Sequence, residues 1–283
     1  MKKVLMNYQS FIGIIDECYP PNSSMDGDRI GLQVQSSVTE VSKVLVAYEL
    51  IDEVIDEAFK NDFNCIVTFH PLIYKPLQAL IEDERVGKLA SRLIKNDIMH
   101  FVVHTNFDSH KNGTNTLIAD NLGLINRKFI VPDPDFNDKG MGLVGLLPNP
   151  LSVEKFVEMC SQVFKSPLRY NVGNGSDIQK VAVIGGSGTS FLNDAANTKA
   201  DVIITSDISY HTFHAFVGKM MLIDPGHFET EQFVSEALFN QLKVVFKDYD
   251  VEFELSKTYT NPVKYYPNTS HYIEKQSNNL KNI

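Results

Sequence analysis

This sequence has few cysteines and no long apolar run, and each absence excludes a class of protein. Its 283 residues include three cysteines, Cys18, Cys65 and Cys160, which lie far apart and are flanked by apolar residues. An odd number of widely spaced cysteines predicts buried, reduced thiols rather than a disulfide framework. No apolar run approaches the roughly 20 residues that span a bilayer, so we expect no membrane segment.

Positive charge is also scarce, since the formal net charge is −9 at pH 7. Non-specific binding to DNA or RNA depends on clustered Lys and Arg, so we do not expect it here. A local metal or cationic site can still hold the phosphates of a nucleotide. The N-terminus begins with basic residues, but Asn7, Gln9 and Asp16 interrupt any signal-peptide core, which predicts a cytoplasmic protein.

The motifs of covalent catalysis are missing as well. The chain has no nucleophile elbow, no CxxC and no Cys-His pairing signal, so hydrolysis through a covalent serine or cysteine is unsupported. The glycine-rich turn Gly185–Gly188 resembles a phosphate cradle, but it lacks the Lys-Ser/Thr of a P-loop. Phosphate contact and close strand-to-helix packing both explain this turn.

Hydrophobic periodicity in the first half of the chain alternates between strand and helix. The predicted helices cover residues 6–18, 52–61 and 86–94, and the predicted strands cover residues 43–48, 64–69 and 98–104. This alternation indicates βαβ units and a largely parallel sheet.

The second half repeats this plan. Lys180-Val-Ala-Val follows Lys43-Val-Leu-Val by 137 residues, and the same offset places Val202–Thr205 opposite Cys65–Thr68. Asp207 then falls opposite His70. We therefore expect an α/β fold made of two related lobes whose strand ends face a common metal cleft.

A segment without periodicity, residues 126–139, predicts the join between the lobes. The expected domains are an N-terminal lobe over 1–127, a C-terminal lobe over 128–266 and a polar tail over 267–283. Within the C-terminal lobe we expect a strand over residues 140–147, a helix over 153–160 and a long amphipathic helix over 229–246.

Three apolar runs stop at a histidine or a carboxylate. They are Thr68-Phe-His70-Pro71, Val103-His104-Thr-Asn-Phe-Asp108 and Asp224-Pro-Gly-His227-Phe-Glu-Thr-Glu231. Side chains at the ends of parallel strands converge, and imidazoles with carboxylates are ligands for zinc, iron or manganese. The three segments together predict a metal centre.

Each of these residues also has a structural explanation. A lone His70 can be a hydrogen-bonded strand-end residue, and Asp108 can be a cap. Glu231 can be a first-turn carboxylate favoured by the helix dipole, although His227 four residues earlier can point to the same side. His104 and His211 are the candidates for proton transfer, and a packed or solvent-facing His211 is the alternative.

These motifs, in this order, resemble the Nif-three-like family, often labelled GTP cyclohydrolase 1 type 2. The resemblance spans about residues 5–266 and includes Asp28-Arg-Ile-Gly31-Leu-Gln, Gly185–Gly188 and Ala200–Thr205. It implies two α/β lobes around a dinuclear metal centre and a toroidal homohexamer built from dimers. Carried over position by position, the metal ligands are His70, Asp108, His227 and Glu231, with His104 close by.

This chain departs from the family pattern at one position beside the implied metal. The family usually has two adjacent histidines where this chain has Phe69-His70, and Phe69 cannot coordinate. We therefore expect one or two divalent ions per subunit. A second, milder departure is Ser206-Asp207, where the family has Gly-Glu.

Two hypotheses for function follow. The first is a metal-dependent hydrolase of the GTP cyclohydrolase 1 type 2 family, in which metal-activated water acts on a nucleotide or related small molecule. The second is a non-catalytic metal-binding scaffold, carrier or regulatory protein, which the Phe69 departure favours. Metal content and turnover of GTP discriminate between them.

Overall fold

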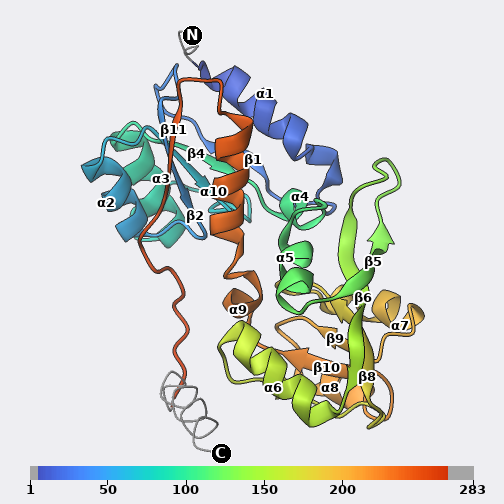
Figure 1. Ribbon diagram of the computed structural model, residues 1–283. Coiled ribbons are helices and arrows are strands. Elements are labelled where there is room, and N and C mark those ends of the chain that lie inside the picture. Colours follow the sequence, from blue (N-terminus) through green and yellow to red (C-terminus); the bar gives the residue numbers. More distant parts are fainter. Residues whose placement is uncertain (1–5, 267–283) are drawn as a thin grey trace, which may run out of the picture. The chain divides into compact units, whose positions relative to one another are not determined.

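The computed structural model describes residues 6–266, so the predicted polar tail lies outside the described residues. The chain divides into two compact units, each built from two stretches of sequence (Figure 1). Within the described residues, the first unit comprises 6–110 and 234–260, and the second comprises 111–233 and 261–266. The first boundary falls between residues 110 and 111, whereas the sequence predicted it between 127 and 128. The chain also returns to the first unit after Phe233.

The first unit is a five-stranded sheet with the order β1-β4-β3-β2-β11. All its strands are parallel except β1, which pairs antiparallel with β4. The strands are β1 (Gly31–Val34), β2 (Lys43–Ala47), β3 (Cys65–Thr68), β4 (Met99–Val102) and β11 (Glu252–Leu255). The helices are α1 (Tyr8–Cys18), α2 (Asp52–Lys60), α3 (Arg85–Lys95), α4 (Thr105–Asp108) and α10 (Val234–Val245), with a 3-10 turn at Pro21–Ser23.

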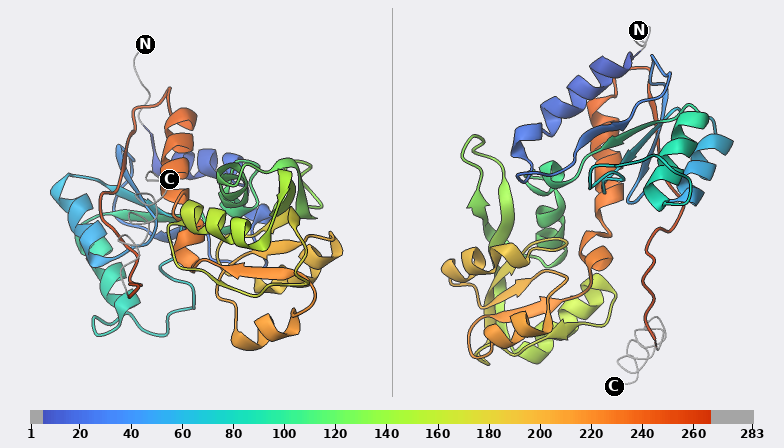
Figure 2. Two further views of the ribbon diagram at one scale, coloured as in Figure 1. Left: turned by 60° about the horizontal axis from the view of Figure 1, so that its bottom comes forward. Right: turned by 180° about the vertical axis from the view of Figure 1, so that it is seen from behind.

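Helices cover both faces of this sheet (Figure 2). On one face, α2 and α3 pack Ile55 and Leu93 against Leu45 and Ile66. On the other face, α10 crosses β2 and β11, and the ring of Phe11 in α1 lies 5.0 Å from that of Phe246. Burial on both faces explains why the central strands are continuous apolar runs.

The second unit is a six-stranded sheet with the order β5-β6-β8-β9-β10-β7. Its strands β8, β9 and β10 are parallel, and the other pairs are antiparallel. The strands are β5 (Ile125–Pro132), β6 (Gly140–Leu151), β7 (Arg169–Tyr170), β8 (Ile178–Val183), β9 (Val202–Ile204) and β10 (Met221–Asp224). The helices are α5 (Thr114–Asn121), α6 (Val153–Phe164), α7 (Leu192–Asn197), α8 (Tyr210–Ala215) and α9 (His227–Glu231), with a 3-10 turn at Thr189–Phe191.

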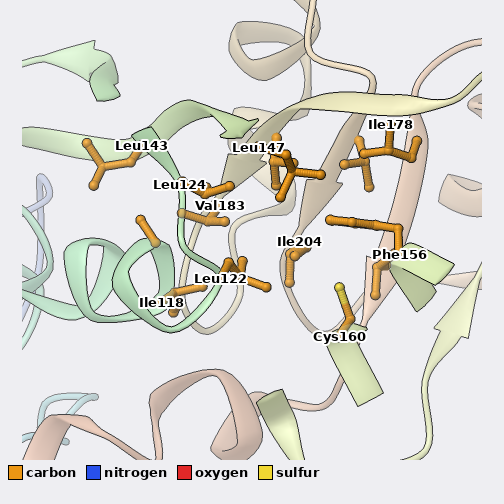
Figure 3. Close-up of a cluster of buried hydrophobic side chains, with 14 of the residues drawn as sticks. Ile118, Leu122, Leu124, Leu143, Leu147, Phe156, Cys160, Ile178, Val183 and Ile204 are labelled. Atoms are coloured by element: carbon orange, nitrogen blue, oxygen red, sulfur yellow. The ribbon is translucent and has the colours of Figure 1, made fainter. Parts of the chain in front are cut away.

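One core cluster of the second unit lies between its sheet and helices α5 and α6 (Figure 3). Ile118 of α5 and Phe156 and Cys160 of α6 are buried against Val183 and Ile204 of the strands. The apolar side of α6, formed by Val153, Phe156, Val157 and Cys160, is therefore core packing. Burial also raises the pKa of the Cys65 and Cys160 thiols, and Cys18 is only partly buried.

The predicted repeat is visible in the strand registers. Val44 pairs with Cys65 in the first unit, and Val181 pairs with Val202 in the second, which are the positions that the offset of 137 residues relates. The expectation of two related α/β lobes is confirmed. The sheets are mixed, because antiparallel strands flank the parallel centre of each.

Three elements differ from expectation. No strand was expected over residues 31–34, which form β1. Residues 125–132 form strand β5, so the segment 126–139 that was expected to join the lobes is most of this strand and its hairpin turn to β6. The expected helix over 229–246 is two helices, α9 and α10. They separate at Gln232, whose side-chain amide donates to the carbonyl oxygens of Phe164 and Glu229.

None of the helices within residues 6–266 combines the length and the apolar character that crossing a bilayer requires.

Candidate metal site

His70 follows the end of β3 in the first unit, and a carboxylate fixes its ring. Its Nδ1 lies 2.9 Å from Glu49 Oε2, and Arg85 Nη2 donates to Glu49 Oε1 at 2.8 Å. Burial alone would raise the pKa of Glu49, but the hydrogen bonds from His70 and Arg85 lower it overall. Because an ionised carboxylate only accepts, Nδ1 of His70 carries a proton, and Nε2 is the ring nitrogen whose lone pair can coordinate.

His104 follows the next strand, β4, and has the same arrangement. Its Nδ1 lies 2.9 and 3.0 Å from the two carboxylate oxygens of Asp28, whose side chain is 3% exposed. Thr105 donates to the same carboxylate from its backbone N–H and its hydroxyl. Burial opposes ionisation of Asp28, but these hydrogen bonds lower its pKa to about 2. Asp28 therefore stays charged and orients His104.

Phe69 and Asp108 complete this part of the first unit. Phe69 is 0% exposed, and its ring meets that of His104 edge-on at 5.2 Å and stacks on Tyr48 at 6.0 Å. The rings of His70 and His104 are 5.4 Å apart. Asp108 is buried one helical turn after His104, and its backbone N–H donates to the carbonyl oxygen of His104. The position beside His70 is thus occupied by an aromatic core residue.

In the second unit, His227 begins α9 and faces two carboxylates. Its Nδ1 lies 2.7 Å from Asp207 Oδ2, and its Nε2 lies 3.2 Å from Glu231 Oε2. Burial lowers the pKa of His227, but the hydrogen bonds to Asp207 and Glu231 outweigh it and raise the pKa to about 10. The two carboxylates therefore favour a positive charge, such as a proton or a metal ion, beside Nε2 of His227.

The glycine-rich turn makes room for Glu231. Gly186 has φ +59°, and a Cβ added there would lie 2.2 Å from Glu231 Oε1. The backbone N–H groups of Gly185, Gly186 and Gly188 donate to the side chains of Asn115, Thr230 and Thr205. Because these amides already have protein partners, close packing explains this turn and a phosphate cradle does not.

His211 is an exposed residue of α8. Its ring meets Tyr210 edge-on at 5.6 Å, and Tyr210 also contacts His214 at 4.6 Å. A role for His211 in proton transfer stays a prediction.

The carboxylates that orient the histidines were not predicted as their partners. Each carboxylate is distant in sequence from its histidine. The separation is 21 residues for Glu49 and His70, 76 for Asp28 and His104, and 20 for Asp207 and His227. Each pairing depends on how strands and loops come together, so spacing alone did not reveal it. The usable signals were the Asp28-Arg-Ile-Gly motif and the repeat, which placed Asp207 opposite His70.

A carboxylate that holds Nδ1 of a histidine is the usual outer contact of a metal-bound imidazole, because it leaves Nε2 for the metal. In the second unit, His227 and Glu231 offer an imidazole and a buried carboxylate, and in the first unit His70 offers an imidazole, which are donors of the kind that bind a metal ion. Two imidazoles with carboxylates suit zinc, iron or manganese.

Comparison with known proteins finds relatives along almost the whole chain. The chain is 32% identical to a GTP cyclohydrolase 1 type 2 homolog of Clostridium perfringens, over 92% of this chain and 100% of that protein. It is also 32% identical to the homolog of Streptococcus pneumoniae, over 92% and 97%.

Solved structures are similar over the same length. Protein SA1388 of Staphylococcus aureus has a TM-score of 0.83 at 25% identity, covering 92% of this chain and 99% of that chain. Reduced HcgD of Methanocaldococcus jannaschii has a TM-score of 0.72 at 27% identity, covering 91% and 100%. The model of the Duf34/NIF3 (NGG1p interacting factor 3) family matches residues 6–262, and the chain belongs to this family.

Proposed function

We propose that this protein is a metal-dependent hydrolase whose divalent ion is bound by His70, His227 and Glu231, with Asp108 as a further ligand. The observation that carries the proposal is the carboxylate on Nδ1 of each strand-end histidine. It fixes the tautomer in which Nε2 can coordinate.

The residues fit an ion of the zinc, iron or manganese class. Glu231 is buried and lies against Gly186, where any side chain would displace its carboxylate. A divalent ion in such a site acts as a Lewis acid and activates water near neutral pH.

The protein's own proton-transfer group is His104. Asp28 holds its Nδ1, so Nε2 is the atom that takes a proton from the attacking water and returns it to the leaving group. His211, the second predicted group, is kept as a candidate. The names of the relatives, GTP cyclohydrolase 1 type 2 homologs, support a nucleotide such as GTP as substrate. In the proposed reaction, water attacks the purine C8 of that nucleotide.

The experiment measures metal content of the purified protein by elemental analysis, then turnover of GTP and of generic phosphate esters. We expect a bound transition metal and a hydrolytic activity that a chelator removes and the metal restores. Activity that resists complete removal of the metal would contradict the proposal.

A non-catalytic metal-binding protein is the second candidate, and Phe69 favours it. A buried phenyl ring beside His70 supplies no ligand and leaves a site with fewer donors than a reactive two-metal centre uses. Bound metal without turnover of GTP or phosphate esters would support this second candidate.

Assembly and location belong to the same proposal. We propose a cytoplasmic homohexamer, a toroid of dimers, on the family resemblance. Light scattering after size-exclusion chromatography should give six times the subunit mass of 31.9 kDa, and a monomer at micromolar concentration would contradict it.

A further inference from the structure

Helix α9 carries a buried carboxylate that the proposed metal site does not use. Glu229 lies two residues after His227 and two before Glu231, and it is 8% exposed. A buried carboxylate needs partners that compensate the loss of hydration. The partners of Glu229 come from the last part of the chain that the structure describes.

Two side chains of the segment Asn261–Tyr266 bind Glu229. Asn261 Nδ2 donates to Glu229 Oε1 at 3.2 Å, and the Tyr265 hydroxyl donates to the same carboxylate. Burial and the negative charge of Glu229 raise the pKa of Tyr265 to about 12, so the phenol stays a donor. Asn261 is buried and also accepts from the backbone N–H of Val263 at 2.9 Å, which shapes the segment as a turn.

Glu229 and Tyr265 also lie close to the backbone of Gly226, which precedes His227. Gly226 has φ +107°, and a Cβ there would lie 2.2 Å from Glu229 Oε2 and 2.6 Å from the Tyr265 hydroxyl. Gly226 is thus required both by its backbone conformation and by the close approach of these two groups. The phenol, the carboxylate and the start of α9 form one packed unit.

We propose that the segment Asn261–Tyr266 positions α9 for metal binding, with Tyr265 and Glu229 as positioning residues for His227 and Glu231. This inference rests on the proposed function, because it assigns α9 the metal ligands. It assigns a role in metal binding to the segment Asn261–Tyr266, which itself contains no proposed ligand.

The length of α9 explains why it needs such support. A helix of five residues cannot hold its own conformation, since so short a segment gains too few hydrogen bonds to offset its lost entropy. Thr230 fixes one side by accepting from the Gly186 N–H at 2.9 Å. Glu229 fixes another side through Tyr265 and Asn261. Without that contact, both ligands must be ordered when the metal binds, which weakens affinity.

The test compares Tyr265→Phe with Tyr266→Phe, because Tyr266 is the neighbouring tyrosine and is 100% exposed. We expect Tyr265→Phe to weaken Zn²⁺ binding about tenfold or more in calorimetry, and Tyr266→Phe to leave it unchanged. Asn261→Ala should act like Tyr265→Phe. The visible spectrum of bound Co²⁺ should change in the same variants, which a loss of general stability would not cause.

If the unmodified protein binds Zn²⁺, equal Zn²⁺ affinity in both tyrosine variants would overturn the inference, even if Tyr265→Phe melts at a lower temperature. Hydrogen exchange of the backbone amides 227–231 in the metal-free protein separates this inference from the proposed function. Faster exchange in Tyr265→Phe alone supports the positioning role, even if the unmodified protein binds no metal. Unchanged exchange contradicts it.

Discussion

At the scale of single residues, each strand-end histidine is defined by a carboxylate as much as by its own position. Glu49, Asp28 and Asp207 each accept from Nδ1, so the proton stays on Nδ1 whenever Nε2 has none. The same imidazoles without these partners would sample both tautomers and more than one rotamer. The ability of His70, His104 and His227 to coordinate a metal or transfer a proton through Nε2 therefore depends on the carboxylate that each one contacts.

The pair His227–Glu231 gives the sharpest test of the ligand assignment. Replacing both residues with alanine should abolish binding of the transition metal, because it removes an imidazole and a buried carboxylate that share one side of α9. Elemental analysis of the purified double variant measures this. Metal content equal to that of the unmodified protein would rule out the assignment.

Phe69 predicts the number of metal ions. With a buried phenyl ring beside His70, the unmodified protein should bind fewer than two ions per subunit, and Phe69→His should raise the stoichiometry. Phe69→His also loses aromatic packing with Tyr48 and His104, which should lower the free energy of unfolding. Truncation of a buried phenylalanine to alanine costs about 3–5 kcal/mol, and replacement by histidine should cost less. Circular dichroism checks folding first, and two tightly bound ions in the unmodified protein would refute the prediction.

Asp28 predicts a dependence of stability on pH. Its folded pKa of about 2 lies below the unfolded value of about 3.9, so its stabilisation is present above that value and is lost as the pH falls from about 4 to 2. In the metal-free protein, Asp28→Asn should lower the free energy of unfolding by about 1–2 kcal/mol at pH 7. The difference from the unmodified protein should vanish near pH 2.

Denaturant titrations at several pH values measure this, with Asp26→Asn as the control. Asp26 is an exposed neighbour, so its replacement should change stability by less than about 0.5 kcal/mol. A pH-independent loss in Asp28→Asn would show that the carboxylate acts through packing alone.

At the scale of helices and strands, local pattern predicted the elements that bury an apolar face. The helices α1, α2, α3 and α6 and the strands β2, β3 and β4 lie where periodicity placed them. Strands β1 and β5 were missed because their residues are mostly exposed or half-buried, so they have no apolar alternation. At the break between α9 and α10, the side chain of Gln232 donates to the carbonyl oxygens of Phe164 and Glu229, and periodicity does not predict these contacts.

The end of α6 gives a prediction about stability. Lys165 at its C-terminal cap has φ +55° and ψ +38°, the left-handed conformation that glycine adopts without strain. Lys165→Gly should therefore raise the free energy of unfolding by up to about 1 kcal/mol. Glu158→Gly, at an exposed position inside the same helix, should lower it by about 1 kcal/mol. Thermal unfolding of both variants checks the opposite signs, and a loss in both would contradict the capping argument.

At the scale of the whole molecule, the sequence predicted two lobes but not their bounds. A linear reading divides the chain once, whereas α10 and β11 return to the first sheet, where β11 pairs with β2 in register Phe253 to Val44. That pairing joins residues about 200 positions apart, and nothing local to either strand specifies it. The candidate ligands are consequently spread over both units, with His70 in the first and His227 and Glu231 in the second.

This distribution predicts how metal binding affects unfolding. A ligand that binds only the folded state stabilises by about 2.7 kcal/mol when present at 100 times its dissociation constant. If one ion takes ligands from both units, Zn²⁺ should raise the melting temperature of both units together. A chelator should reverse the shift, which differential scanning calorimetry measures.

Single substitutions in either unit then distinguish a shared ion from a local one. His70→Ala changes the first unit and His227→Ala the second, yet each should remove most of the Zn²⁺-dependent shift from the whole transition. His214→Ala, which replaces an exposed histidine of α8 outside the proposed site, should keep the full shift and controls for surface binding. If His70→Ala keeps the full shift while His227→Ala loses it, the ion is held by the second unit alone, and His70 is not one of its ligands.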